Sequence, residues 1–169
     1  MVFFIFFLRK FFKGHASVLG YRRFLRSTLI GGDYELIDRN TLEPNPDYFI
    51  AYMWSLYFSP KVLSCSLQGG NHESACYAAL ARKPAAGDAH TAIIVMNTSV
   101  KSTMSFRLKG KFAAFQFRGV GVRGACAVVS RSGKCELLTR ASMKATLSRP
   151  VMHEDLIVLH PFSYAILLQ

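Results

Sequence analysis

The segment from Thr28 to Tyr52 constrains the fold of this chain more than any other stretch. It reads as the end of a β-prone run, a Gly31-Gly32 turn, a polar loop and the start of a helix. The triplet Asn45-Pro46-Asp47 supplies a capping residue, a proline suited to the first helical position and an acid that complements the helix dipole. Residues 48–58 are apolar almost all round, which predicts a helix that is buried on most sides and that stops at Pro60.

The rest of the chain has the pattern of a β structure. Residues 101–109 alternate, with Lys101, Arg107 and Lys109 on a polar face and apolar side chains on the other. We expect strands at 61–67, 75–81, 91–96, 101–109, 112–118, 126–130, 136–139, 156–159 and 162–168. Short strands separated by Gly, Ser and Asn predict a mainly β (α+β) fold, built as an antiparallel β-sandwich.

The positive charge is large and uneven, +11 in total over 169 residues. Residues 101–149 hold eleven basic groups against Glu136 alone, whereas residues 31–60 hold five acids against Arg39. The simpler interpretation, which we favour, is that these charges are only the solvated faces of strands. The alternative is an acidic partner, such as a sulfated or uronic-acid glycan, nucleic acid or an anionic membrane surface. Among these, nucleic acid is not expected, because the sequence contains no recognition motif for it.

The amino-terminal segment is atypical. Its apolar run, residues 2–8, is far shorter than the roughly 20 residues that span a bilayer. Arg9, Lys10 and Lys13 follow the run, whereas a signal peptide carries its basic residues first, so we find no convincing signal peptide. We interpret residues 1–20 as an artificial start, as in a truncated gene product. The alternative is a Phe-rich anchor that associates peripherally with a membrane surface.

Four cysteines, at positions 65, 76, 126 and 135, show no C-x-x-C spacing, and the histidines are scattered. We therefore predict no metal site and no cofactor. The four cysteines allow three pairings, and Cys126 with Cys135 would close a hairpin if the chain is secreted. Asn97-Thr98-Ser99 is an acceptor triplet for N-glycosylation at Asn97.

Several short motifs follow one another at the spacing of a known family. They are Leu29-Ile30-Gly31-Gly32-Asp33-Tyr34, Leu36-Ile37-Asp38, Pro44-Asn45-Pro46-Asp47-Tyr48, Lys61-Val62-Leu63, Tyr77-Ala78 and His160-Pro161-Phe162-Ser163-Tyr164. Together they resemble the carboxyl-terminal portion of heparanase-like glycoside hydrolases (glycoside hydrolase family 79), which pair a (β/α)8 barrel with a β-sandwich. The resemblance begins at about Tyr21, after the atypical segment 1–20. It implies the last strand-loop-helix unit of a TIM-type barrel at 21–59 and a β-sandwich at 60–169.

The resemblance also implies a function. These enzymes hydrolyse β-glucuronidic bonds in heparan sulfate or plant glucuronides with retention, using two glutamates that come from earlier barrel strands. No acidic residue precedes Gly31 here, so we expect no catalytic residue in this chain and no activity of the chain alone. By resemblance Gly31, Gly32 and Tyr34 would contact the substrate. A new acid pair of Asp33 and Glu35 is disfavoured, because nothing in the sequence splits their pKa values.

The alternative function is a non-catalytic module that binds polyanions such as heparan-type glycans through Lys101, Arg107 and Lys109. In either case the expected partner is an acidic glycan or a glucuronide. The resemblance implies the secretory pathway, either outside the cell or at the membrane of a lysosome or vacuole.

Overall fold

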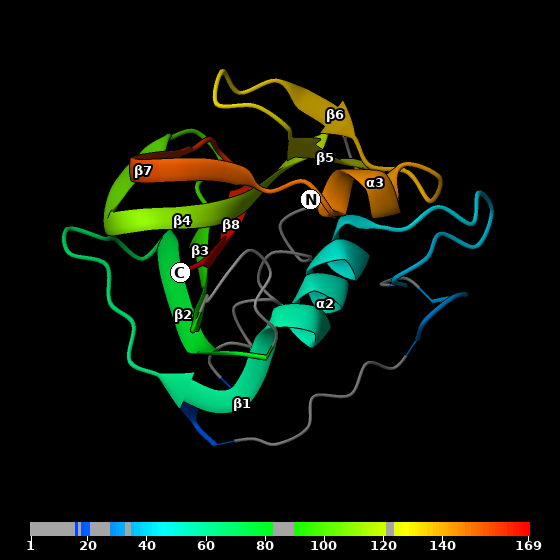
Figure 1. Cartoon of the computed structure of the whole chain (residues 1–169). Helices are drawn as coiled ribbons and strands as arrows, with labels where there is room; N and C mark the ends of the chain where they lie inside the picture. The colour runs from blue at the N-terminus through cyan, green and yellow to red at the C-terminus, as the bar shows by residue number, and fades with distance from the viewer. Residues whose placement is uncertain (1–15, 17, 21–27, 33–34, 83–89, 121–123) are drawn as a thin grey trace.

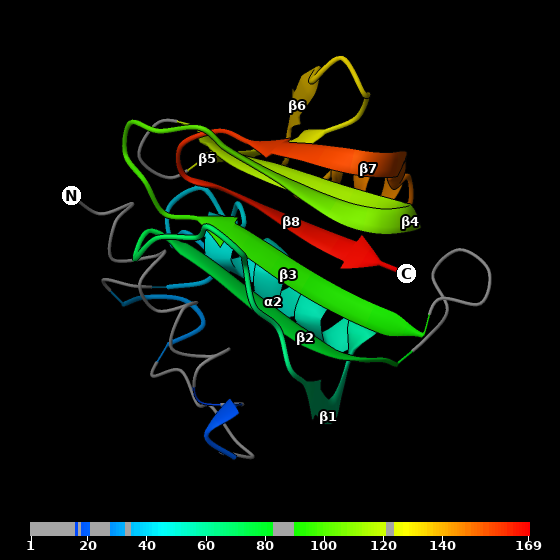
Figure 2. The same ribbon diagram turned by 90° about the vertical axis from the view of Figure 1, so that its left-hand side faces the viewer.

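The computed structural model describes residues 16, 18–20, 28–32, 35–82, 90–120 and 124–169 (Figure 1). Within these residues eight strands form one antiparallel sheet, and helix α2 (Pro46–Tyr57) lies against one of its faces (Figure 2). The strands are β1 (Phe58–Leu63), β2 (Ser74–Ala81), β3 (Thr91–Asn97), β4 (Met104–Val120), β5 (Gly124–Val128), β6 (Cys135–Leu137), β7 (Val151–Leu159) and β8 (Ser163–Leu168). A short helix, α3 (Met143–Leu147), precedes β7.

The last strand of the chain lies in the middle of the sheet. The strand order is β1-β2-β3-β8-β4-β5-β6, and β7 pairs with β4 outside this path. All six residues of β8 are buried, because β3 and β4 flank it and both faces of the sheet are covered there. A strand buried on both faces reads as a continuous apolar run, which is how residues 164–168 appear in the sequence.

Strand β4 connects two parts of the structure. Its first half pairs with β7 and its second half with β8 and β5. The ladder with β7 shifts register between Arg107 and Lys111, where Gly110 has a φ of +92°. The irregularity lies at Gly110 because only glycine adopts this φ without strain. The two strands predicted at 101–109 and 112–118 are therefore one strand with a bulge, which corrects the predicted break.

Two apolar clusters lie on opposite faces of the sheet. One combines Phe49 and Met53 of α2 with sheet residues such as Phe115 and Phe117. The other includes Phe112 of β4 and Ile157 and Leu159 of β7, with alternate residues of β3 and β8. Consecutive residues of β4 thus serve opposite clusters, as the alternation of a strand requires. The mainly β prediction is confirmed, with the qualification that all eight strands belong to one hydrogen-bonded sheet.

Helix α2 begins where the sequence predicts and ends earlier. Pro46 is its first residue and Asp47 lies in its first turn. Its last residue is Tyr57, and β1 starts at once with Phe58. Pro60 lies inside β1, an outer strand of the described sheet, where a missing N–H is tolerated. The strand predicted at 61–67 therefore lies three to four residues earlier, and the predicted domain boundary at 59/60 falls within it.

Candidate functional site

The Gly31-Gly32 turn needs both of its glycines, for different reasons. Gly31 has a φ of +91°, a conformation that is strained for any other residue. Gly32 lies against Thr28, so that a β-carbon at residue 32 would stand 2.7 Å from Thr28 Cγ2. Gly31 is exposed and Gly32 is half-buried, so the backbone of the turn is open to solvent.

The buried side chain of Glu35 holds this turn in place. Its side chain is 4% exposed, and its carboxylate accepts hydrogen bonds from the backbone amides of Gly31 and Arg39. The guanidinium of Arg39 lies 3.7 Å from the same carboxylate. Burial alone would raise the pKa of Glu35, but the two amides and Arg39 outweigh it, so that the pKa lies below the usual glutamate value. Glu35 is therefore ionised and structural.

The loop after the turn is held by its own polar groups. Asp38 Oδ1 accepts hydrogen bonds from the amides of Asn40 and Thr41, 2.9 and 3.0 Å away. Asn45, predicted to cap α2, instead donates from Nδ2 to the carbonyl of Glu35, and no side-chain cap is formed. The loop also contacts the segment between β6 and α3, since Glu43 Oε2 accepts a 2.7 Å hydrogen bond from the amide of Arg140.

Two of the three residues predicted to contact a substrate lie within the described residues. Gly31 and Gly32 lie together on the surface, while Tyr34 lies outside the described residues, as does Asp33. The disfavoured acid pair gains no support, because the Glu35 carboxylate already serves the turn and its pKa is lowered, the reverse of what a proton donor needs.

The predicted polyanion contacts are exposed. Arg107 and Lys109 share the open face of β4, and Lys101 lies in the loop before it. The predicted alternation holds, because Met104, Phe106 and Leu108 are half-buried against the second cluster. The basic face is not continuous, however. Leu156 and Val158 of β7 stand on it beside β4, and they are 49% and 40% exposed.

Asn97, the predicted glycosylation acceptor, is buried. It is 2% exposed, and its Nδ2 donates to the carbonyls of Ser102, Leu159 and His160 at 2.8, 3.0 and 3.1 Å. Its Oδ1 accepts from the amide of Ser99. A glycan on Nδ2 would break this network, so the folded chain does not offer Asn97 as an acceptor. A local triplet carries no information about these distant carbonyls.

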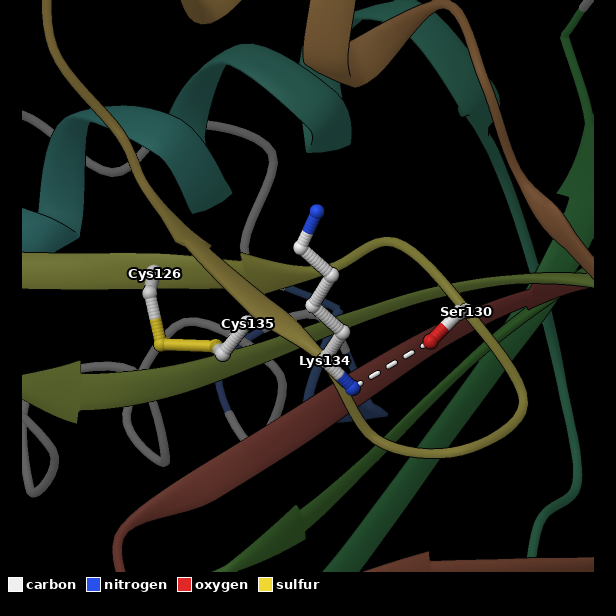
Figure 3. The surroundings of a disulfide bond; sticks show 4 residues. All are labelled: Cys126, Ser130, Lys134 and Cys135. Carbon is white, nitrogen blue, oxygen red and sulfur yellow. Dashed lines mark hydrogen bonds between the residues drawn. A yellow bond between two sulfur atoms is a disulfide. The ribbon is translucent and has the colours of Figure 1, made fainter.

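Both cysteine pairs form disulfides. Cys126 and Cys135 join β5 to β6, which confirms the predicted hairpin bridge (Figure 3). Cys65 and Cys76 form the second bridge, between the loop after β1 and strand β2. The described part of the chain has no cluster of ligands that would hold a metal ion. Among the same residues, no helix is both long enough and apolar enough to cross a bilayer.

One group that the sequence analysis did not single out is Arg118, near the end of β4. It is half-buried, opposite Cys126 on β5 and Ser163 on β8. Within the described residues no hydrogen bond or ion pair reaches its guanidinium. The sequence distinguishes Arg118 only by its position eight residues before Cys126, a cysteine of the predicted hairpin bridge.

Comparison with known proteins finds similarity over part of the chain. No family model matches the chain. Baicalin-β-D-glucuronidase of Scutellaria baicalensis is 39% identical over 56 residues, which is 33% of this chain and 11% of that protein. Heparanase-like protein 3 of Arabidopsis thaliana is 36% identical over 56 residues, again 33% of this chain and 10% of that protein. Heparanase-like protein 1 of the same plant is 39% identical over 46 residues, 27% of this chain and 8% of that protein.

These matches span about a tenth of the length of the curated relatives. A solved arabinofuranosidase structure covers 57% of this chain and 19% of its own, with a TM-score of 0.35 and 10% identity, and we infer nothing from it. The similarity that the motifs indicate is confirmed for a third of the chain, which over that stretch resembles heparanase-like glycoside hydrolases.

Proposed function

We propose that this chain is the carboxyl-terminal portion of a heparanase-like β-glucuronidase, and that it does not cleave glycosidic bonds alone. The observation that carries the proposal is the 56-residue similarity to a glucuronidase and to a heparanase-like protein. In this proposal residues 21–59 are the last unit of a (β/α)8 barrel, and residues 60–169 are a β-sandwich at its edge. The apolar cluster between β7 and the middle of the sheet supports a second layer there.

The chemistry explains the proposed inactivity. Retaining hydrolysis of a glycoside needs two carboxyl groups about 5 Å apart, one with a raised pKa to protonate the leaving oxygen. Among the described residues, Glu35 is the carboxylate nearest in sequence to the turn. The hydrogen bonds that it accepts from two backbone amides help to lower its pKa. We propose that the catalytic carboxylates belong to earlier barrel strands.

The turn would contribute contact with the substrate. Gly31 is exposed and a β-carbon on it would meet no described atom within 4 Å, so a ligand can approach the backbone of the turn closely at this residue. The negative charge of Glu35 is already compensated by two backbone amides and by Arg39. A uronate carboxylate next to the turn therefore meets little repulsion from it. The two disulfides favour an oxidising compartment, in agreement with the proposed secretory location.

A fluorogenic β-glucuronide tests the proposal. We expect the purified 169-residue chain to release no fluorophore above the buffer rate, while an active β-glucuronidase in a parallel reaction does. Turnover that stays with the chain through repeated purification would contradict the proposed inactivity. The contact is tested separately by the NMR signal of the Gly32 amide. It should move with glucuronate and not with glucose, and an unmoved signal would remove the proposed role of the turn.

A second candidate function is binding of polyanionic glycans by the exposed face of β4, for which the exposure of Arg107 and Lys109 is the supporting observation. Exposed charges contribute mainly salt-dependent attraction. We expect Arg107→Gln with Lys109→Gln to elute from heparin at a lower salt concentration than a variant that loses two other exposed charges, Lys61→Gln with Arg82→Gln. Equal elution would leave only the effect of net charge.

A further inference from the structure

Arg118 is an unusual cation in this fold. Its side chain is half-buried, and burial lowers the pKa of its guanidinium. In the described part of the chain, no carboxylate or carbonyl accepts from it. A partly desolvated charge without a partner costs stability, and an anion bound to it would recover that cost.

A short loop lies directly beside Arg118. A β-carbon on Gly133 would stand 3.5 Å from Arg118 Nη2, so the guanidinium reaches the backbone of the loop 130–134. Gly133 has a φ of +83°, which turns the chain at this point. At Gly133 the loop therefore borders the arginine with backbone alone.

The loop is ordered by its own bonds. Gly133 N donates to the carbonyl of Ser130 at 3.0 Å, and Lys134 N donates to Ser130 Oγ at 3.2 Å (Figure 3). The hydroxyls of Ser130 and Ser132 lie 2.8 Å apart. The Cys126–Cys135 disulfide closes the base of the hairpin. Such bracing fixes the loop in advance and reduces the ordering cost of binding.

The loop also adds positive charge. Arg131 donates from Nε to the carbonyl of Met152 at 2.8 Å, which orients its guanidinium beside β7. Lys134 pairs with Glu136 at 3.3 Å, with both side chains largely in solvent. The charge of Lys134 is thus offset by Glu136, while two hydroxyls, the exposed Arg131 and the half-buried Arg118 are groups that bind the oxygens of an anion.

We propose that Arg118 and the loop Ser130–Lys134 bind an oxyanion group of an acidic glycan, either a sulfate or a uronate carboxylate. A glycan is favoured over nucleic acid because residues 124–135 contain no aromatic side chain on which a base would stack. The site lies at the opposite end of β4 from Arg107. It is also separate from the Gly31-Gly32 turn, so it goes beyond the proposed function and does not depend on it.

Binding of a heparin hexasaccharide to the whole chain at 50 and 150 mM salt tests the site. We expect Arg118→Gln to weaken binding about tenfold, as for a lost charge-assisted hydrogen bond. Arg149→Gln removes an exposed charge outside the loop and should change binding less than about twofold. Equal weakening by the two changes would overturn the proposal, because net charge alone would then explain binding.

Further arms identify the ligand. A fully desulfated hexasaccharide keeps its carboxylates. If Arg118→Gln affects it as much as the sulfated form, the bound group is the uronate, and if only the sulfated form binds, the group is the sulfate. A DNA duplex that binds as tightly, with the same sensitivity to Arg118→Gln, would overturn the assignment to glycans. Urea unfolding checks that the Arg118→Gln variant is folded. Lys134→Gln provides a second, exposed change in the loop.

An NMR titration of His160 provides a second test of the site. Burial lowers the pKa of His160, and the positive charge of the nearby Arg118 lowers it further. A sulfate ion on Arg118 would offset this repulsion, so inorganic sulfate should raise the pKa of His160 in an NMR titration. The Arg118→Gln variant is the control, in which His160 should not respond beyond the effect of ionic strength. If His160 responds alike in the variant and in the unmodified chain, Arg118 does not hold the anion.

Discussion

Gly32 and Thr28 are in such close contact that a β-carbon at residue 32 would meet both Oγ1 and Cγ2 of the threonine. We expect Gly32→Ala to lower the free energy of unfolding by about 1–3 kcal/mol, the usual cost of overpacking. Thr28→Ala removes both clashing atoms, so the double variant should recover most of this loss. Urea unfolding of the two single variants and the double variant measures the coupling, and strictly additive effects would show that the contact is absent in solution.

Because His153 and His160 are half-buried, we expect mild acidification to lower the free energy of unfolding. Burial is the main cause that lowers the pKa of both side chains below the usual histidine value. As the pH falls, these histidines therefore take up protons in the unfolded chain before they do so in the folded chain. The free energy of unfolding should therefore fall as pH decreases through the unfolded value of about 6.5 and on toward the lower folded pKa. The slope is at most about 1.4 kcal/mol per pH unit for each proton.

Unfolding in urea between pH 7.5 and 5.0 measures this slope. His153 stacks on Phe112 with ring centroids 5.9 Å apart, and no partner is present for its buried Nε2 within the described residues. His153→Phe should keep the stack and flatten the slope, because it removes one of the two half-buried histidines. A stability that rises on acidification would contradict the lowered pKa values.

Glu35, whose pKa is also lowered, stabilises the fold above its unfolded pKa, and that contribution is lost only at more acidic pH, as the folded carboxylate becomes protonated.

The two disulfides close loops of similar length, with sequence separations of 11 and 9 residues. The loop-entropy relation gives each about 2.5–3 kcal/mol of stabilisation. We expect the paired change Cys126→Ser with Cys135→Ser to lower the free energy of unfolding by that amount. The pair Cys65→Ser with Cys76→Ser should cost about the same. If a reducing agent leaves the unfolding midpoint of the unmodified chain in place, the bridges do not form in solution.

Asn97 holds two parts of the chain together. Because its buried Nδ2 serves three carbonyls, we expect Asn97→Ala to cost about 2–4 kcal/mol, the penalty for leaving buried polar groups without partners. Lys101→Gln keeps the glycosylation triplet, changes an exposed side chain and is the control for substitution nearby. When the chain is made in a secretory cell, the folded product should show no mass change after treatment with an N-glycosidase. A shift in mass would contradict the buried placement.

Local patterns predicted those elements whose causes are local. The proline at residue 46 and the acid at 47 mark the start of α2, and the apolar runs mark β3 and β8. The continuity of β4 could not be predicted, because Lys109-Gly110-Lys111 has the composition of a break. Only the pairing of both flanks with β7, from more than forty residues later, makes it a bulge.

The candidate site divides in the same way. Gly31 and Gly32 were found because a glycine pair signals a turn in the sequence itself. The anchoring of that turn by Glu35 depends on burial, which the sequence does not display. Arg118 was missed because a cation on an alternating strand looks solvated until the loop beside it is in place.

The direct passage from α2 to β1 leaves no slack between Tyr57 and Phe58. Tyr57 and Arg82 secure this junction, since the amide of Arg82 donates to the carbonyl of Tyr57 at 2.7 Å. The helix cannot slide or rotate without dragging the first strand along its neighbour β2. Inserting a single residue at this joint would rotate the aromatic side of the helix by about 100° relative to the sheet. Gene fusions or circular permutations that cut here should therefore be poorly tolerated, and swaps with related proteins should carry the helix and the sheet as one piece.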